Sequence, residues 1–375
     1  MNAVVTDVQY RMTLALIRDL ADGGIKNITA VCRKGQGAPV GFYSKHVSNH
    51  ILLTEKAEME YAKHLSEVCK KIENPVLLCP GRDTISAVSK YPELFKDIAH
   101  LVPTEENLNN ANDKSAVIDA AVSAGVPVPK SYTLDDAEYP CVIKYRCGEK
   151  LGKKANERYS IINNRESLIK TYNEYLKLDS EPVLQEYIEG DGFGVSLVMD
   201  KEQNAVDFIS HRRVRQFPSS GGPSTCCETY FNENMVNDAV RLLKKIGFTG
   251  VAMVEFKGTD DNYRLMEINP RVWGSYALAR ACNSSFSMSW FNASAGERLK
   301  PADLTKPNYS LGVKMQFFPS ELKLLNELIR NKRIGESGII IKDLLNPKVR
   351  DGVIEFSDIS ASLHYIKSLV SGGDR

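Results

Sequence analysis

The sequence lacks the features that would place a protein in a membrane or on a nucleic acid. No apolar run approaches the roughly 18 residues of a membrane-spanning helix. The opening segment, MNAVVTDVQYRM, carries Asp7 and no basic leader, so we expect no secretory signal. The 48 basic and 47 acidic side chains leave a net charge of +1, which gives no long-range attraction for polyanions. We therefore expect a cytoplasmic protein that acts on small molecules.

Two compact motifs are also missing. The eight cysteines form no Cys-x-x-Cys pair, which fits free thiols in a reducing compartment. Cys226 and Cys227 are adjacent, but no histidine lies near them in sequence, so a redox or nucleophilic role is disfavoured. The pattern Gly-x-Gly-x-x-Gly is absent, which leaves a dehydrogenase without local support.

Residues 1–110 alternate short apolar strands with amphipathic helices. Strands are predicted at NAVVT, ITAVC, HILLT and PVLLC, and helices between them. This βαβ rhythm indicates a parallel, doubly wound sheet. Gly81, Arg82 and Asp83 follow a strand end, where such sheets bind ligands, although an ordinary connecting loop explains them equally well.

The rest of the chain has a different rhythm. An Asn-rich loop precedes a helix over 114–124, and strands are predicted at YPCVIKY, VLQEYI, GFGVSLVMD and AVDFISHRRVRQF. Asn164 is expected to cap a helix, and residues 217–227 are expected to form a flexible loop. Antiparallel strands with packed helices predict an α+β unit. A helix with one interruption near Asn283 is predicted over 274–296, and a strand over 310–318. The last 45 residues mix short apolar runs with charge and indicate no function.

The most informative stretch is GVAMVEFKGTDDNYRLMEINPRVWGS, residues 250–275. It reads as a β-hairpin that turns at Asp261, which puts Glu255 opposite Glu267, with Asn269 two residues along. Two facing carboxylates on apolar strands need a cation between them or a raised pKa in one of them. Two carboxylates and an amide suit Mg²⁺, and Arg271 beside them could hold a developing negative charge. The alternative is a hairpin with a charged outer face.

Three other segments suit a nucleotide or an anionic substrate. Lys144 stands alone on an apolar strand before a basic loop that contains Gly148 and Gly152, whose backbone could approach phosphate oxygens; a solvated surface loop is the alternative. The VLQEYI strand could offer backbone groups to an adenine edge. Arg213 and Arg215 share one face of their strand and suit a carboxylate or phosphate, or else form a solvated basic edge.

The order of these motifs, above all MEINPRVWGS after the Glu255 strand, resembles the ATP-grasp superfamily of ligases over about residues 1–300. CVIKY and VLQEYIEG support the resemblance. It implies a mixed α/β and α+β fold: a Rossmann-like parallel-sheet domain at 1–112, an ATP-grasp pair with antiparallel sheets at 113–190 and 191–300, and a C-terminal extension at 301–375 that packs on the core.

The resemblance also implies roles for single residues. Lys114 and Lys144 would contact ATP phosphates, with the loop from Cys147 to Lys154 closing over them, and Arg271 would stabilise an acyl phosphate. The expected nucleotide and metal residues are Gln185, Glu186, Tyr187 and Ile188 for adenine, Asp191 for the ribose, and Glu255, Glu267 and Asn269 for Mg²⁺, with Mn²⁺ as an alternative ion.

The implied activity is an ADP-forming ligase that activates a carboxylate as an acyl phosphate and transfers it to an amine. Carbamate or bicarbonate as the acid and a thiol as the acceptor stay open as variants, and so does a homodimeric assembly. The alternative from another class is a catalytically silent nucleotide-binding sensor or scaffold, against which the complete set of Glu255, Glu267 and Asn269 argues.

Overall fold

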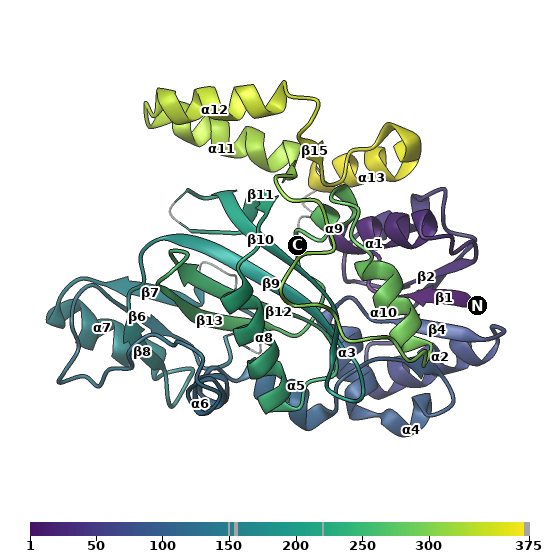
Figure 1. The fold of residues 1–375 in the computed structure, drawn as a ribbon, viewed down its shortest axis with the longest axis horizontal. Coiled ribbons are helices and arrows are strands. Elements are labelled where there is room, and N and C mark those ends of the chain that lie inside the picture. Colours follow the sequence, from purple (N-terminus) through teal and green to yellow (C-terminus); the bar gives the residue numbers. More distant parts are fainter. Residues whose placement is uncertain (149–150, 154–156, 220, 371–375) are drawn as a thin grey trace.

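The computed structural model describes residues 1–148, 151–153, 157–219 and 221–370. Its first part is a parallel sheet in the strand order β3-β2-β1-β4-β5, shown in purple and blue on the right of Figure 1. The strands are β1 (Asn2–Val5), β2 (Ile28–Arg33), β3 (Asn49–Leu53), β4 (Pro75–Leu78) and β5 (Ala99–His100), and the helices are α1 (Arg11–Asp22), α2 (Glu58–Lys70), α3 (Arg82–Lys90) and α4 (Pro92–Phe95). The predicted parallel α/β fold is confirmed.

This sheet is buried on both faces, which explains its apolar strands. Ala3 and Val5 of β1 point into the largest hydrophobic core of the protein. Val4, between them, points to the opposite face and into a second core with Leu77 and residues of α2 and α3. Side chains alternate between the two faces of a strand. Only the face that carries Ala3 and Val5 therefore packs in the same core as the rest of the protein.

The Asn-rich stretch that was predicted as a loop is helical. It forms α5 (Glu105–Asn112), which leads into α6 (Lys114–Ser123). Thr104 caps α5 by accepting a hydrogen bond from the Asn107 backbone N–H, and Asp113 caps α6 by accepting from the backbone N–H groups of Ser115 and Ala116. Two successive N-caps outweigh the low helix propensity of asparagine.

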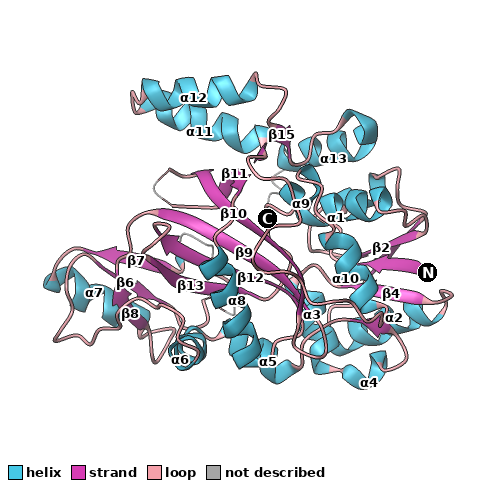
Figure 2. Ribbon diagram, in the orientation of Figure 1, coloured by secondary structure: helices cyan, strands magenta, loops and turns pink. Residues whose placement is uncertain are grey.

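A large, mostly antiparallel sheet crosses the centre of the molecule (Figure 2) in the order β13-β12-β9-β10-β11-β14-β15. Its strands are β9 (Asp191–Met199), β10 (Ala205–Gln216), β11 (Ser224–Thr229), β12 (Gly250–Gly258), β13 (Tyr263–Asn269), β14 (Lys314–Gln316) and β15 (Arg350–Asp351), and α8 (Glu233–Ile246) packs on β9. The flexible loop predicted for 217–227 is wrong in its second half, because 224–229 form β11. Cys226 and Cys227 are buried there, between β10 and β14.

A small sheet in the order β7-β6-β8 lies at the other end of the molecule. It consists of β6 (Cys141–Lys144), β7 (Tyr159–Ile162) and β8 (Val183–Glu186), and α7 (Arg165–Tyr175) contacts β7. Asn164 caps α7 as predicted, by accepting a hydrogen bond of 2.9 Å from the Ser167 backbone N–H. The small sheet and α7 have a hydrophobic core of their own.

The C-terminal region returns to the large sheet and to the N-terminal helix. It contains α9 (Ala277–Ala281), α10 (Phe286–Ser294), α11 (Phe318–Arg330), α12 (Ile334–Leu344) and α13 (Ile359–Val370). The break predicted near Asn283 is confirmed, since that residue has a φ of 57° between α9 and α10. The strand predicted at 310–318 is shorter than expected and covers only β14. Figure 1 shows α11 and α12 side by side above β11.

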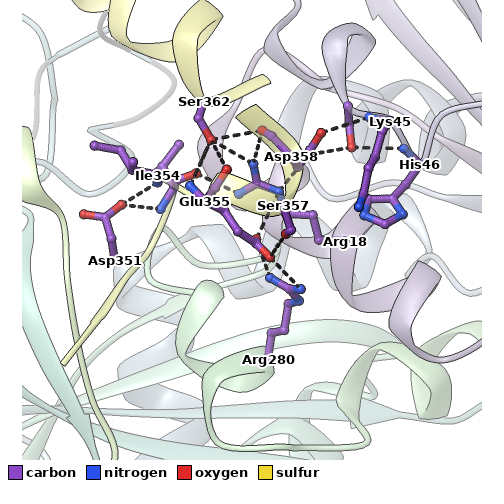
Figure 3. A network of polar contacts seen from close by, with 12 residues as sticks. Arg18, Lys45, His46, Arg280, Asp351, Ile354, Glu355, Ser357, Asp358 and Ser362 are labelled. Carbon is purple, nitrogen blue, oxygen red and sulfur yellow. Dashed lines mark hydrogen bonds and ion pairs between the residues drawn. The ribbon is translucent and has the colours of Figure 1, made fainter. Parts of the chain in front are cut away.

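A buried polar network ties the segment before α13 to α1 (Figure 3). The Arg18 guanidinium donates to Asp358 at 2.9 Å, and Asp358 also accepts from the Ser44 hydroxyl at 2.8 Å. Glu355 binds Arg280 at 2.6 Å. Burial alone would raise the pKa of Glu355, but hydrogen bonds from Arg280 and Ser357 and the charge of Arg18 lower it to about 2. The two contacts of Asp358 join residues more than 300 positions apart.

None of the helices in the described part of the chain is long and apolar enough to cross a bilayer. The predicted boundaries at 112, 190 and 300 stay predictions.

Candidate nucleotide and metal site

Two glutamates face each other across the β12–β13 hairpin. The strand register pairs Glu255 with Glu267 and Met253 with Asn269, as the sequence predicted for a turn at Asp261. The register shifts immediately after Glu255, where the hairpin carries an irregularity. Directly opposed side chains point to one face, so both carboxylates are held on the same side of the sheet.

Asn269 and Arg271 complete this arrangement. The Asn269 Nδ2 donates to Glu255 Oε1 at 3.0 Å and lies 3.4 Å from Glu267 Oε1. The Asn269 Oδ1 accepts a hydrogen bond of 2.9 Å from Arg271. The N–H side of the amide therefore points at both carboxylates.

The carboxylate pair is electrostatically strained. Burial raises the pKa of Glu255, and the neighbouring charge of Glu267 raises it further, to about 6. The charges of Arg213 and Arg271 and the hydrogen bond from Asn269 act in the opposite direction but do not cancel the rise. A bound divalent cation would relieve the repulsion between the two glutamates.

Two lysines face the carboxylates from the small sheet and from α6. Burial lowers the pKa of Lys144 to about 8, while the charge of Glu267 opposes this shift and that of Lys114 adds to it. Lys114 Nζ lies 3.9 Å from Glu267 Oε2. Both amino groups are thus placed beside the acidic pair, where the phosphates of a bound nucleotide would bring further negative charge.

These groups line one cavity of about 980 Å³. The sequence-predicted residues on its wall are Lys114, Lys144, Glu186, Tyr187, Ile188, Asp191, Arg213, Arg215, Glu255, Glu267, Asn269 and Arg271. Gln185 and Gly148 line a smaller cavity of about 30 Å³, which shares Lys114, Glu267 and Asn269 with the first. Gly152 adopts a φ of 67°, the left-handed conformation that glycine tolerates best. Residues 149–150 and 154 of the predicted phosphate loop lie outside the described residues.

The β8 strand is less open to a nucleotide than the sequence suggested. Its outer edge is partly covered, because the Glu186 N–H donates to Lys130 O at 2.8 Å and the Tyr132 N–H donates to Leu184 O at 3.0 Å. Tyr187 and Ile188, which follow the strand, line the cavity.

The three arginines and the aspartate of this region have different partners. Arg213 Nη2 lies 3.8 Å from Glu255 Oε2. Arg215, by contrast, is bound at 2.8 Å to Glu321 and at 2.7 Å to Asp343, carboxylates of α11 and α12. A bulge in the β10–β11 pairing separates the two arginines. The predicted substrate role therefore fits Arg213 better, and Arg215 anchors the C-terminal helices. Asp191 lies 3.5 Å from Arg212.

Sequence reasoning missed the floor and one end of the cavity. Across the sheet, Glu267, Glu255, Gly194 and His211 form one row of paired residues. A Cβ on Gly194 would lie 2.4 Å from the His211 ring, so this position has no room for a side chain and requires glycine. The pair Gly192 and Gly194 in an otherwise apolar strand was the signal for a close approach. Arg11, from α1, also lines the cavity and gave no signal in sequence.

The donor set fits Mg²⁺. Among the described residues no three His, Cys, Asp or Glu side chains cluster so as to hold a metal ion. The ligands would therefore be two carboxylates and one amide, with the remainder from water and phosphate, as Mg²⁺ prefers.

Residues 111–275 match the family model of the ATP-grasp domain, and the predicted resemblance is confirmed. The N5-carboxyaminoimidazole ribonucleotide synthase of Saccharolobus solfataricus is 26% identical over 196 residues, which cover 49% of this chain and 51% of that protein. The chain thus matches about half the length of this curated relative.

Solved structures support the same fold. Biotin carboxylase from Campylobacter jejuni, in complex with an ATP analogue, superposes with a TM-score of 0.64 at 15% identity, over 84% of this chain and 74% of that one. The biotin carboxylase domain of 2-oxoglutarate carboxylase from Hydrogenobacter thermophilus, with MgADP and bicarbonate, gives 0.62 at 15% over 84% and 73%. L-amino acid ligase from Bacillus licheniformis gives 0.58 at 13% over 84% and 78%. At these identities the likeness shows the fold.

Proposed function

We propose that the protein is an ATP- and Mg²⁺-dependent ligase that activates a carboxylate as an acyl phosphate and transfers it to an amine, releasing ADP and phosphate. The observation that carries the proposal is the pairing of Glu255 with Glu267, with Asn269 between them and Lys114 and Lys144 alongside. Strained carboxylates next to lysines form a site for a metal–nucleotide complex.

Each group has a task that follows from its position. Glu255, Glu267 and Asn269 would hold Mg²⁺, which when bound offsets the negative charge of the phosphates. Lys144 and Lys114 would bind phosphate oxygens. Arg271, fixed by its hydrogen bond to Asn269, would stabilise the negative charge of the acyl phosphate.

The nucleotide base would lie between the two sheets. Tyr187 and Ile188 line the cavity after β8, and Val142 and Ile161 of the small sheet provide an apolar wall. The Lys257 ammonium lies 4.8 Å from the centre of the Tyr187 ring, which holds the ring in place by a cation–π contact. Asp191, at the start of β9, is the candidate for the ribose.

An ADP-release assay tests the proposal. Mixed carboxylic acids, with bicarbonate as a separate arm, are combined with mixed amines or thiols, with Mg²⁺ or Mn²⁺. We expect release that needs the metal, a carboxylate and an amine together. Glu267→Gln should lower it by at least about a hundredfold, a loss of about 2.7 kcal/mol, while Glu297→Gln, on an exposed loop, should leave it unchanged.

Each contrary result has a distinct meaning. Unchanged ADP release in Glu267→Gln would refute the assignment of the metal site. Tight ATP binding without ADP release in any arm would establish the silent nucleotide-binding alternative. Release with bicarbonate or with thiols alone would keep the acyl phosphate and change the substrate class.

We also propose a homodimer, because the Hydrogenobacter thermophilus domain that shares this fold is described as a dimer. Sedimentation equilibrium would test it: a mass near twice 41.8 kDa supports the dimer, and a mass near 41.8 kDa refutes it.

A further inference from the structure

A bulge at the end of β10 changes the direction in which its side chains point. The pairing of β10 with β11 shifts twice, between Arg213 and Arg215 and between Arg215 and Gln216. Residues three positions apart point to opposite faces of a regular strand. Arg213 Nη1 nevertheless donates a hydrogen bond of 3.1 Å to Gln216 Oε1. The irregular pairing therefore places these two side chains on one face of the sheet.

Arg213 has a second partner at the start of β11 and a glycine beneath it. Its Nε donates a hydrogen bond of 3.0 Å to the Ser224 hydroxyl. Ser224 is also the cross-strand partner of Gln216, so both acceptors stand at the same end of the β10–β11 pair. On β9, a Cβ on Gly192 would lie 3.7 Å from the Arg213 Cβ and 3.8 Å from its Nε. Because the guanidinium is a rigid fork, hydrogen bonds at Nε and Nη1 fix the direction of Nη2 as well.

The third nitrogen of this guanidinium faces the acidic pair. Arg213 Nη2 lies 3.8 Å from Glu255 Oε2, which is within ion-pair distance but too long for a hydrogen bond. The other oxygen of Glu255, Oε1, accepts a hydrogen bond of 3.0 Å from the Asn269 amide. Glu255 thus stands between a guanidinium and an amide, and all three groups line the same cavity. An anion that enters beside Glu255 would therefore meet Nη2.

An arginine that is held in place before its ligand arrives binds an anion more tightly than a mobile one, because it has less side-chain freedom to lose. In the proposed reaction, the anion next to the metal site is the carboxylate that attacks the nucleotide. Nη2 can donate to this carboxylate while Nε and Nη1 keep their partners in the protein. Loss of Ser224 or Gln216 would leave the positive charge in the cavity but release its direction.

We propose that Ser224 and Gln216 are positioning residues that aim Arg213 Nη2 at the substrate carboxylate. The inference rests on the proposed function for the identity of the anion, whereas the orientation of Arg213 is a property of the β10–β11 pair itself. It adds to the proposed reaction two neutral residues that act on it through the arginine.

A binding experiment tests the positioning without any turnover. The probe is acetate, titrated into the full-length protein with saturating Mg²⁺ and a non-hydrolysable ATP analogue, so that the phosphate-binding lysines are already engaged. Binding is followed by tryptophan fluorescence, since Trp273 lines the same cavity. The affinity for the analogue is measured as well, and it should be the same in wild type and in Ser224→Ala.

Ser224→Ala and Gln216→Met should each weaken acetate binding by about tenfold, which corresponds to one hydrogen bond to a charged group. Ser224→Thr keeps the hydroxyl and should recover most of the affinity. The control is Ser86→Ala, which removes a serine hydrogen bond of 2.9 Å to the charged side chain of Glu58 and should bind acetate as wild type does. Unchanged affinity in either Ser224→Ala or Gln216→Met, or no acetate binding by wild type, would overturn the proposal.

A double-mutant cycle determines whether Ser224 acts through Arg213. Arg213→Gln should weaken acetate binding at least as much as Ser224→Ala does. Adding Ser224→Ala to Arg213→Gln should cause no further loss, because the hydroxyl then has no guanidinium to hold. Additive losses would reject the positioning role. Urea unfolding of each variant distinguishes these effects from a general loss of structure.

Turnover then separates this inference from the proposed function. If ADP release occurs, Ser224→Ala should lower kcat/KM for the carboxylate by about tenfold and leave the KM for ATP unchanged. An unchanged kcat/KM would overturn the positioning role and keep the ligase. Acetate binding with the expected cycle, but without ADP release in any arm of the screen, would reject the ligase and keep the positioning of Arg213.

Discussion

Glu255 offers the sharpest test of the electrostatics, because its removal should stabilise the protein and abolish its activity at the same time. Its pKa is raised from 4.5 to about 6 in the folded state. A carboxyl that binds its proton more tightly when folded favours folding while it is protonated. The contribution of this group to stability is therefore greatest below pH 4.5 and declines as the pH rises to about 6.

The magnitude follows from the size of the shift. About 1.5 pKa units at 1.36 kcal/mol per unit give about 2 kcal/mol of destabilisation above pH 6. Glu255→Gln keeps the shape of the side chain and removes the charge. Without divalent ions it should raise the free energy of unfolding by about 2 kcal/mol at pH 8 and change it little at pH 4.5.

Urea unfolding at the two pH values measures this difference. Trp273 and Trp290 both belong to the core that packs beneath the site, so their fluorescence reports its unfolding. Glu297→Gln serves as the control and should stay within about 0.5 kcal/mol of wild type at both values. A Glu255→Gln protein that gains nothing at pH 8, or gains equally at pH 4.5, would refute the assignment of strain to this carboxylate.

Two further predictions concern the neighbouring cations. Arg215→Met should destabilise the protein by about 3–5 kcal/mol in urea unfolding, because Glu321, whose side chain is 0% exposed, loses its partner. The double variant Arg215→Met/Glu321→Gln should recover part of the lost free energy of unfolding. An Arg215→Met protein as stable as wild type would contradict the anchoring role of Arg215. Lys144→Gln should weaken ATP binding by about 10- to 100-fold in isothermal titration, the worth of a charge-assisted hydrogen bond. Lys170→Gln, which changes an exposed residue of α7, should leave ATP binding unchanged. Equal losses of ATP affinity in Lys144→Gln and Lys170→Gln would exclude a specific phosphate contact of Lys144.

Local patterns predicted the parts of the site that depend on neighbouring residues in sequence. The pairing of Glu255 with Glu267 follows from a short hairpin, whose turn sets the register of both strands. The cap at Asn164 and the break at Asn283 are likewise decided within a few residues. Resemblance to a family then joined Lys144 to the hairpin, although more than a hundred positions separate them.

Contacts between distant segments could not be predicted in this way. Arg215 has the same sequence environment as Arg213, and only the position of α11 and α12 shows that its charge is used by Glu321 and Asp343. Arg11 is one basic residue at the start of a helix, and its place in the cavity depends on how the parallel sheet packs against the large one. The strand at Ser224–Thr229 lies between β10 and β14, and β14 comes almost a hundred residues later in the chain.

The division of the hydrophobic cores decides which part of the molecule can move around a bound nucleotide. Val5 of the parallel sheet and Val254 of the hairpin belong to one continuous core, so separating those regions would expose apolar surface to water. The small sheet that carries Lys144 has a separate core, so it can move as a rigid body without exposing the apolar residues of either core to water. Opening and closing around a nucleotide should therefore displace the small sheet together with Lys144, while Glu255, Glu267 and Arg11 keep their mutual positions.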